Sequence, residues 1–329
     1  MMAPAPVVEG ELMALNLTED ALYFVDRRDG TPISGLVNRY YGAIKRYDLS
    51  GGQTTTLFAT ERSDIMDLLV TADALYVATR ITGGPDIVNV YRLPLSGEGM
   101  AVPVSPAWSM GESAFVRSAL VGSVGDVLVV DGFRGTMALS LTDGSVRRLV
   151  PASEQLVSMQ LLGNQLWYGT EQGRGGIFRV EVSAPGSMPV EVYPKGCSNG
   201  VLGKTGWFLA TSGELACGGN TTIQGLAPDG SGEARSWDLT GIDPTPYYPT
   251  YSDNDALYLA SDDTGVRVPR SGGSPEYFSC EAVPVDGIRT NANWFVWGRG
   301  LQPNAGVFTA ATPVVLGPAV FSAIYAKRR

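Results

Sequence analysis

Acidic and basic side chains recur where a repeated apolar segment of this sequence ends, and their types could bind a polar ligand or support acid–base chemistry. Carboxylates and guanidinium groups gathered on one rim suit the recognition of charged ligands. Asp26 and Asp131 end equivalent segments and could pair as acid and base across a channel. The candidate residues are Asp26, Arg27, Arg28, Arg80, Asp131, Arg134, Glu171, Arg174, Glu214, Asp262, Asp263 and Arg299.

The connection after the first of these segments is a long candidate binding loop. It covers 17 residues, 26–42, and carries Tyr40 and Tyr41 in addition to Arg27 and Arg28. Long loops in compact domains are often functional, and Tyr and Arg are favoured in binding interfaces. We predict that these residues contact a ligand. The alternative interpretation is that exposed loop tips are simply charged.

The sequence contains no histidine, which narrows the chemistry that these residues could perform. Histidine is the usual general base near neutral pH and the commonest metal ligand, so Ser-His-Asp, Cys-His and histidine–metal sites are excluded. Any catalysis would depend on carboxylates, Tyr, Lys or Arg. We expect no cofactor. The alternative is a divalent cation such as Ca²⁺, bound by carboxylates in a central channel.

The three cysteines are Cys197, Cys217 and Cys280, and no CxxC spacing suggests zinc. Cys197 and Cys217 flank the fifth repeat described below, on what we expect to be the same face, so a disulfide between them is predicted. A disulfide indicates an oxidising compartment. We therefore expect an extracytoplasmic location (periplasm, cell surface or secreted), although "MMAPAPVVEGE" lacks the features of a signal peptide.

Charge and hydropathy exclude two classes of partner. The net charge is −9, and the only run of three like charges is Lys327–Arg329, which argues against nucleic acid. Residues 300–326 carry no charge and resemble a membrane anchor, but Pro303, Pro313 and Pro318 interrupt them. We predict no membrane span there. Arg outnumbers Lys 20 to 4, which is typical of a GC-rich bacterial gene.

The elements that must position these residues are copies of one short segment. Seven related segments recur about 37 to 53 residues apart, and a period of this length indicates an array of supersecondary units. They are DALYFVD from Asp20, DALYVAT from Asp73, GDVLVVD from Gly125, NQLWYGT from Asn164, TGWFLAT from Thr205, DALYLAS from Asp255 and ANWFVWG from Ala292. Their third positions are Leu22, Leu75, Val127, Leu166, Trp207, Leu257 and Trp294.

Each segment is followed by a second motif, Gly–x–apolar–x–Arg–apolar, and then by a glycine turn, as in GAIKRYDLSGG from Gly42. One strand before the repeated segment and one after the second motif give each unit four strands. No window of the sequence shows helical periodicity. The sequence thus predicts an all-β fold, a single seven-bladed β-propeller of four-stranded antiparallel blades spanning residues 1–329. The predicted blades are residues 12–61, 62–108, 109–155, 156–199, 200–246, 247–284 and 285–329.

The two chain ends offer alternative ways to complete the last blade. Residues 319–326, AVFSAIYA, alternate as a strand with one packed face does, and we expect them to be its outer strand. The first residues would then be free. In the alternative arrangement, VVEG at residues 7–10 supplies that strand and joins both ends of the chain.

The motifs resemble a known repeat. LYFVD at residues 22–26 is similar to the strand of the YWTD repeat, and IKRYDLSGG at residues 44–52 resembles the half that YWTD repeats share with TolB-like bacterial propellers. This resemblance implies a propeller that binds other macromolecules. It implies no catalytic residue, because the motif is structural. YWTD propellers have six blades, whereas seven segments are present here.

We therefore expect a non-enzymatic binding propeller, exported from a bacterial cell, that recognises a protein or a polysaccharide through the face carrying the loops. The alternative is a hydrolase or lactonase-type propeller that uses carboxylates and a metal ion in its central channel. Three or four acids that converge on the channel would favour the enzyme.

Overall fold

A computed structural model of the chain shows only β-strands as regular elements among the residues that it describes, and all of their ladders are antiparallel. The described residues are 5–27, 42–60, 63–81, 87–97, 99–104, 108–109, 119–132, 135–151, 156–170, 176–194, 197–198, 205–206, 208–211, 213–217, 221–242, 248–260, 264–281, 283, 287–300 and 320–329. The chain divides into two compact units, Met1–Arg147 with Asp286–Arg329, and Arg148–Val285.

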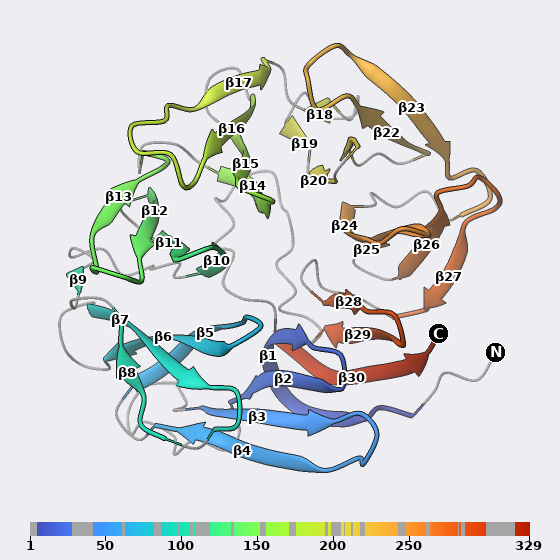
Figure 1. Cartoon of the computed structure of the whole chain (residues 1–329). Coiled ribbons are helices and arrows are strands. Elements are labelled where there is room, and N and C mark those ends of the chain that lie inside the picture. Colours follow the sequence, from blue (N-terminus) through green and yellow to red (C-terminus); the bar gives the residue numbers. More distant parts are fainter. Residues whose placement is uncertain are drawn as a thin grey trace, which may run out of the picture. The chain divides into compact units, whose positions relative to one another are not determined.

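The first unit contains a seven-stranded, a five-stranded and a four-stranded sheet among its described residues (Figure 1). The seven-stranded sheet has the order β28 (Ile288–Thr290), β29 (Trp294–Gly300), β30 (Val320–Arg328), β1 (Val8–Leu17), β2 (Ala21–Asp26), β3 (Ala43–Asp48) and β4 (Thr54–Ala59). The five-stranded sheet consists of β5 (Ser63–Val70), β6 (Ala74–Ile81), β7 (Ile87–Pro94), β8 (Val102–Pro103) and β9 (Trp108–Ser109). The four-stranded sheet consists of β10 (Ala119–Val124), β11 (Val127–Gly132), β12 (Gly135–Ser140) and β13 (Val146–Arg148).

The second unit repeats the four-stranded pattern. Its first sheet consists of β14 (Leu156–Leu162), β15 (Gln165–Thr170), β16 (Ile177–Glu181) and β17 (Val190–Tyr193). A short pair, β18 (Cys197–Ser198) and β19 (Thr205–Gly206), precedes β20 (Phe208–Ala210), β21 (Leu215–Cys217), β22 (Thr222–Leu226) and β23 (Glu233–Asp238). The last sheet consists of β24 (Tyr248–Ser252), β25 (Ala256–Ala260), β26 (Gly265–Pro269) and β27 (Glu276–Ser279). The predicted all-β class and the four-stranded antiparallel sheets are confirmed.

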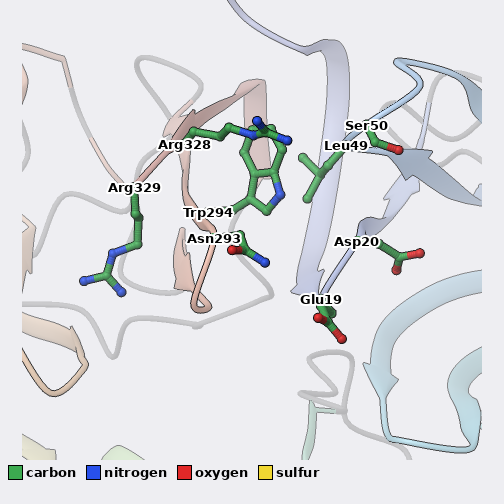
Figure 2. Close-up of a pocket in the computed structure, with 8 residues that line it drawn as sticks. All are labelled: Glu19, Asp20, Leu49, Ser50, Asn293, Trp294, Arg328 and Arg329. Atoms are coloured by element: carbon green, nitrogen blue, oxygen red, sulfur yellow. The ribbon is translucent and has the colours of Figure 1, made fainter.

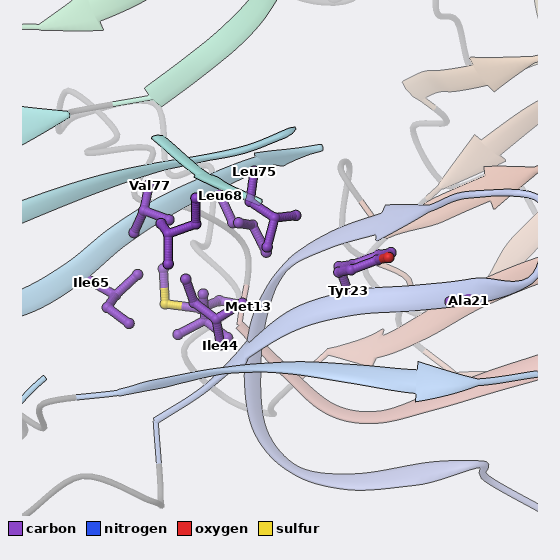
Figure 3. Packing of buried hydrophobic residues seen from close by; sticks show 10 residues of the cluster. Met13, Ala21, Tyr23, Ile44, Ile65, Leu68, Leu75 and Val77 are labelled. Carbon is purple, nitrogen blue, oxygen red and sulfur yellow. The ribbon is translucent and has the colours of Figure 1, made fainter. Parts of the chain in front are cut away.

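The repeated segment is buried on both of its faces, as the sequence predicts. Leu22 and Phe24 of β2 pack in a cluster with Val296 and Phe321, on the side of β29 and β30. Tyr23, on the opposite face of β2, belongs to a second cluster that includes residues of the neighbouring five-stranded sheet. Figure 3 shows part of this second cluster. Because successive side chains of a strand point to opposite faces, both faces of this strand must be apolar.

The structure corrects the alignment of three of the seven segments. The buried position equivalent to Leu22 is Leu128 in the third segment, because Leu128 pairs with Ser123 as Leu22 pairs with Leu17. In the seventh segment the equivalent position is Phe295, which is half-buried and pairs with Thr290 as Leu22 pairs with Leu17.

The fifth segment is the first strand of its sheet, β20, and the second strand is the short β21. The apolar run of the first strand resembles the repeated segment more closely than the three residues of β21 do. This resemblance explains why the sequence places the fifth segment as a second strand. Trp207 lies outside the described residues.

The predicted arrangement of the chain ends is wrong. Strand β30 pairs directly with β29, so it is the third strand of the last four-stranded group rather than its outer strand. Val8 and Glu9 of β1 pair with Ile324 and Ala323 on the other edge of β30, and the first residues are therefore not free. From Leu12 onwards β1 pairs with β2, so one strand belongs to the last group and to the first. The segment AGVFTAATP, which the sequence places as the third strand, lies outside the described residues.

Polar side chains connect neighbouring first strands, which have no backbone ladder between them. Asn16 of β1 donates to the carbonyl of Leu68 at 2.9 Å, and Asp67 of β5 accepts from the amide of Leu120 at 2.7 Å. In the second unit, Gln160 accepts from the amide of Ala210 at 2.6 Å. Because buried backbone groups are costly when unpaired, these side chains stabilise the junctions between sheets.

Candidate functional site

A groove with charged walls lies at one edge of the seven-stranded sheet. We call this the turn edge, because the turns β1–β2, β3–β4 and β28–β29 lie along it. The turn-edge groove has a volume of about 760 Å³, within the roughly 300–1,000 Å³ typical of ligand sites. It is lined by Glu19, Asp20, Leu49, Ser50, Asn293, Trp294, Arg328 and Arg329 (Figure 2).

Asn291 fixes the two sides of this groove relative to each other. Its side-chain oxygen accepts from the amides of Asn293 and Trp294 at 2.9 and 2.8 Å, which shapes the β28–β29 turn. Its side-chain nitrogen donates to the carbonyl of Thr18 at 2.6 Å, in the β1–β2 turn. One residue therefore shapes one wall and attaches it to the other, so the groove is preformed.

The first wall carries two arginines and an indole. Trp294 and Arg328 pair across β29 and β30, and the guanidinium group of Arg328 lies 5.6 Å from the centre of the indole ring. Trp294 also packs against the apolar cluster that contains Leu49. The amide of Arg329 donates to the carbonyl of Asn293 at 3.0 Å, which holds the end of β30 against the turn.

The second wall is acidic. Glu19 and Asp20 are exposed in the β1–β2 turn, and Asp20 forms a 3.4 Å ion pair with Arg46 of β3. Figure 2 shows the two acids on the opposite side of Asn293 and Trp294 from Arg329. The groove therefore presents cationic and anionic groups on different sides.

The adjoining β3–β4 turn is organised by Asp48. This carboxylate accepts from the amide and hydroxyl of Ser50 at 2.8 and 2.7 Å and from the amide of Gly51 at 2.8 Å. These hydrogen bonds, with that of Gly51 the largest, lower the pKa of Asp48 from 3.8 to about 2. The anionic form of Asp48 therefore holds Ser50 at the rim of the groove.

A second groove occupies the equivalent position between the five-stranded sheet and the sheet of β10–β13. The amide of Leu49 donates to the carbonyl of Asp20, and that of Leu141 donates likewise to Asp126, so the two pairs are equivalent. The second groove has a volume of about 400 Å³. Arg92 and Asp73, which form a 2.8 Å ion pair, line it together with Asp126. The only arginine among its lining residues is thus paired with one of its two aspartates, whereas the larger groove is lined by two arginines and two acids.

The predicted rim residues that the structure describes in unit one interact with their own neighbours. Asp26 is buried and forms a 3.0 Å ion pair with Lys45, and Arg27 forms a 3.1 Å pair with Glu11. Arg299 donates to the hydroxyl of Ser322 at 2.9 Å.

Asp131, the suggested partner of Asp26 in acid–base chemistry, accepts from the hydroxyl of Thr136 at 2.9 Å. The remaining candidates, which stay predictions, are Arg28, Tyr40, Tyr41, Arg134, Glu171, Arg174, Asp262 and Asp263, all outside the described residues, and Arg80, whose side chain is not described.

Glu214 does not lie in a loop after a second strand, contrary to the prediction. It lies in the β20–β21 turn, with its side chain only 5% exposed. Arg235 donates to its two oxygens at 2.6 and 2.7 Å, and Arg270 donates at 2.8 Å. The hydrogen bond with Glu214 holds the pKa of Arg235 above its ordinary value. This carboxylate therefore connects two sheets of the second unit, which is a structural role.

Within the part of the chain that the structure describes, no three carboxylate or thiol side chains come together to hold a metal ion. Cys217 is disulfide-bonded, and Cys280 is a free, exposed cysteine. The side chain of Cys197 is not described, so the Cys197–Cys217 pairing stays a prediction. The described residues include no helix of the length and hydropathy needed to span a membrane.

Comparison with known proteins shows the fold alone. No protein-family model matches the chain, and no curated protein matches it in sequence. The structure of U3-55K is similar with a TM-score of 0.60 and 9% identity, over 96% of each chain. A prolyl endopeptidase structure is similar with a TM-score of 0.56 and 16% identity, over 88% of this chain and 45% of that one.

TolB from Acinetobacter baumannii is a more distant match, with a TM-score of 0.43 and 12% identity over 68% of this chain and 53% of that one. The chain thus spans about half the length of the TolB and endopeptidase chains. The likenesses with TM-scores above 0.5, together with the four-stranded antiparallel sheets, indicate a β-propeller fold. They do not identify the type of repeat.

Proposed function

We propose that this chain is a non-enzymatic binding protein, a seven-bladed propeller of the TolB-like or YWTD-like kind, exported from a bacterial cell. It recognises a polymeric partner, a protein or a polysaccharide. The observation that carries the proposal is the turn-edge groove, whose two preformed walls carry exposed charges of opposite sign. Pre-organised polar groups with complementary charge favour specific recognition.

The buried carboxylates support binding rather than acid–base chemistry. Asp26 and Glu214 are buried, and each is bound by basic side chains, Lys45 for the first and Arg235 and Arg270 for the second. The oxygens of a carboxylate held in this way are occupied by the protein's own side chains, which suits a structural role. The loop residues predicted from the sequence remain part of this proposal as a second contact surface.

The test compares the full chain with a variant whose groove is reversed in charge, Arg328→Glu/Arg329→Glu. Each protein is applied to a glycan array. Each is also immobilised and exposed to the extracytoplasmic proteins of the native host. We expect the native chain to retain a partner or glycan that the variant loses. Equal retention by the two proteins would exclude the groove as the binding site.

A parallel experiment addresses the enzyme alternative. The native chain is incubated with ester, lactone and glycoside substrates, with and without Ca²⁺. We expect no turnover above that of a heat-denatured sample. Turnover that depends on Ca²⁺ would support the metal-dependent hydrolase instead.

A further inference from the structure

The turn-edge groove has opposite charges on its two walls, and this arrangement restricts what it can bind. Arg328 and Arg329 follow one another at the end of β30 and line the groove, so the first wall is cationic. Glu19 and Asp20 follow one another in the β1–β2 turn, so the second wall is anionic. A ligand that fits both walls must carry charges of both signs on its two sides.

An extended polypeptide has this property. Side chains that follow one another along a strand point in opposite directions, so alternating basic and acidic residues place all positive groups on one side and all negative groups on the other. Resting on the proposed binding function, we propose that the turn-edge groove binds an extended peptide segment in which basic and acidic residues alternate. The basic side chains face Glu19 and Asp20, and the acidic side chains face Arg328 and Arg329.

A polysaccharide fits these walls less well. An acidic polysaccharide carries only negative charge and would be repelled by Glu19 and Asp20. Sugar rings are also recognised by stacking on aromatic faces, but the indole of Trp294 packs against the cluster around Leu49 and is covered by Arg328. The groove therefore favours the protein member of the two partner classes.

The groove is fixed before the peptide arrives. Asn291 connects the two walls through its 2.6 Å hydrogen bond to Thr18, and the amide of Arg329 is bound by Asn293 at 3.0 Å. Since the walls need no rearrangement, binding depends on charge complementarity and should weaken with ionic strength.

Two synthetic peptides of equal composition and charge test the pattern. One alternates single lysines and aspartates, and the other alternates Lys-Lys with Asp-Asp. Only the first separates the two charges onto different sides when extended. By fluorescence anisotropy with the full chain at low salt, we expect the first peptide to bind at least about tenfold more tightly, and less tightly as salt is added.

Variants of each wall complete the test. Glu19→Lys/Asp20→Lys and Arg328→Glu/Arg329→Glu should each lose the alternating peptide, and the first should gain affinity for poly-aspartate and the second for poly-lysine. Glu19→Asp/Arg329→Lys, which keeps both charges, should retain binding, and thermal melts establish that each variant is folded. Equal affinity for the two peptides, or unchanged binding by both reversed variants, would overturn the proposal.

The proposed function has a separate outcome. If the native chain retains a glycan that the Arg328→Glu/Arg329→Glu variant loses, while neither peptide binds, the binding function stands and the peptide proposal is wrong. If neither glycans, host proteins nor peptides distinguish the native chain from the variant, both proposals fail.

Discussion

The side-chain amide of Asn291 donates a 2.6 Å hydrogen bond to the carbonyl of Thr18, which lies 273 residues earlier in the chain. The two residues occupy neighbouring turns, β28–β29 and β1–β2, because β1 and β30 pair in the same sheet. The same side chain closes its own turn through the amides of Asn293 and Trp294. One residue thus shapes a wall of the groove and connects the two turns that border it.

Replacement of Asn291 with alanine should therefore destabilise the first unit. The change removes the hydrogen bond to Thr18 and the two bonds within the turn, and we expect a loss of about 1–2 kcal/mol in the free energy of unfolding. Chemical denaturation measures this loss. Asn293→Ala, two residues along in the same turn, is the matched control and should cost less than about 0.5 kcal/mol. Equal losses would show that Asn291 has no special role.

The N-terminal strand offers a second test. The amide of Val7 donates to the carbonyl of Ile324 at 2.8 Å, and Val8 pairs with the same residue. Deletion of residues 1–8 exposes this edge of β30 and removes two half-buried valines, so we expect a loss of about 2–4 kcal/mol. Differential scanning calorimetry should show a clearly lower melting temperature, whereas the exposed Glu9→Ala should leave it nearly unchanged. An unaffected deletion variant would restore the free N-terminus expected from the sequence.

Glu214 allows a test of a buried ion pair in the second unit. Glu214→Gln keeps the shape of the side chain but leaves Arg235 and Arg270 without their counter-charge. Because Arg235 is partly exposed, we expect a loss of about 2–4 kcal/mol, somewhat below that of a fully buried pair. Glu276→Gln, which affects an exposed pair with Arg267 at 3.9 Å, should change the stability by less than about 0.5 kcal/mol. Similar urea midpoints for the two variants would contradict the structural role of Glu214.

The strand pattern could be predicted from the sequence because it depends on local information. Alternating apolar residues and glycine turns identify strands and hairpins, and the burial of both Leu22 and Tyr23 follows from the period of a strand. The pairing of β1 with β30 could not be predicted in the same way. An alternating segment such as Val320–Arg328 fits either the third or the fourth position of a sheet, and only the long-range partners decide between them.

The candidate site shows the same limit. The predicted binding residues follow second strands, on the edge opposite the groove, so Arg328, Trp294 and Asn291 are not among them. One local signal was present: an asparagine two and three residues before Asn293 and Trp294 is typical of a turn capped by its own side chain. Nothing local, however, indicates that this turn meets Thr18, because that contact depends on the pairing of the chain ends.

The cysteines provide a test that needs no substitution. Cys217 is disulfide-bonded and Cys280 is free and exposed, so the native protein should have one reactive thiol. With three cysteines in the chain, denaturation and reduction should expose two more. A bridge to Cys197 closes a loop of about 20 residues and should contribute on the order of 3 kcal/mol. Peptide mapping identifies the partner, and three reactive thiols without reductant would contradict both the bridge and the expected export.

The pH dependence of the β3–β4 turn tests the role of Asp48. Hydrogen bonds from Gly51 and Ser50 lower the pKa of Asp48 from its ordinary 3.8 to about 2 in the folded protein. A carboxylate whose folded pKa is depressed stabilises the fold above its unfolded pKa, and this contribution is lost as the pH falls through the folded value. The stability difference between the native chain and Asp48→Asn should therefore be constant at neutral pH and shrink between about pH 4 and pH 2. Denaturation across this range measures the difference, and NMR titration of the Asp48 carboxyl gives its pKa directly. Asp20→Asn, in the neighbouring turn at the same groove, controls for the general effect of removing one negative charge. A difference between the native chain and Asp48→Asn that stays constant down to pH 2, or an ordinary pKa for Asp48, would show that its anionic form does not hold the turn.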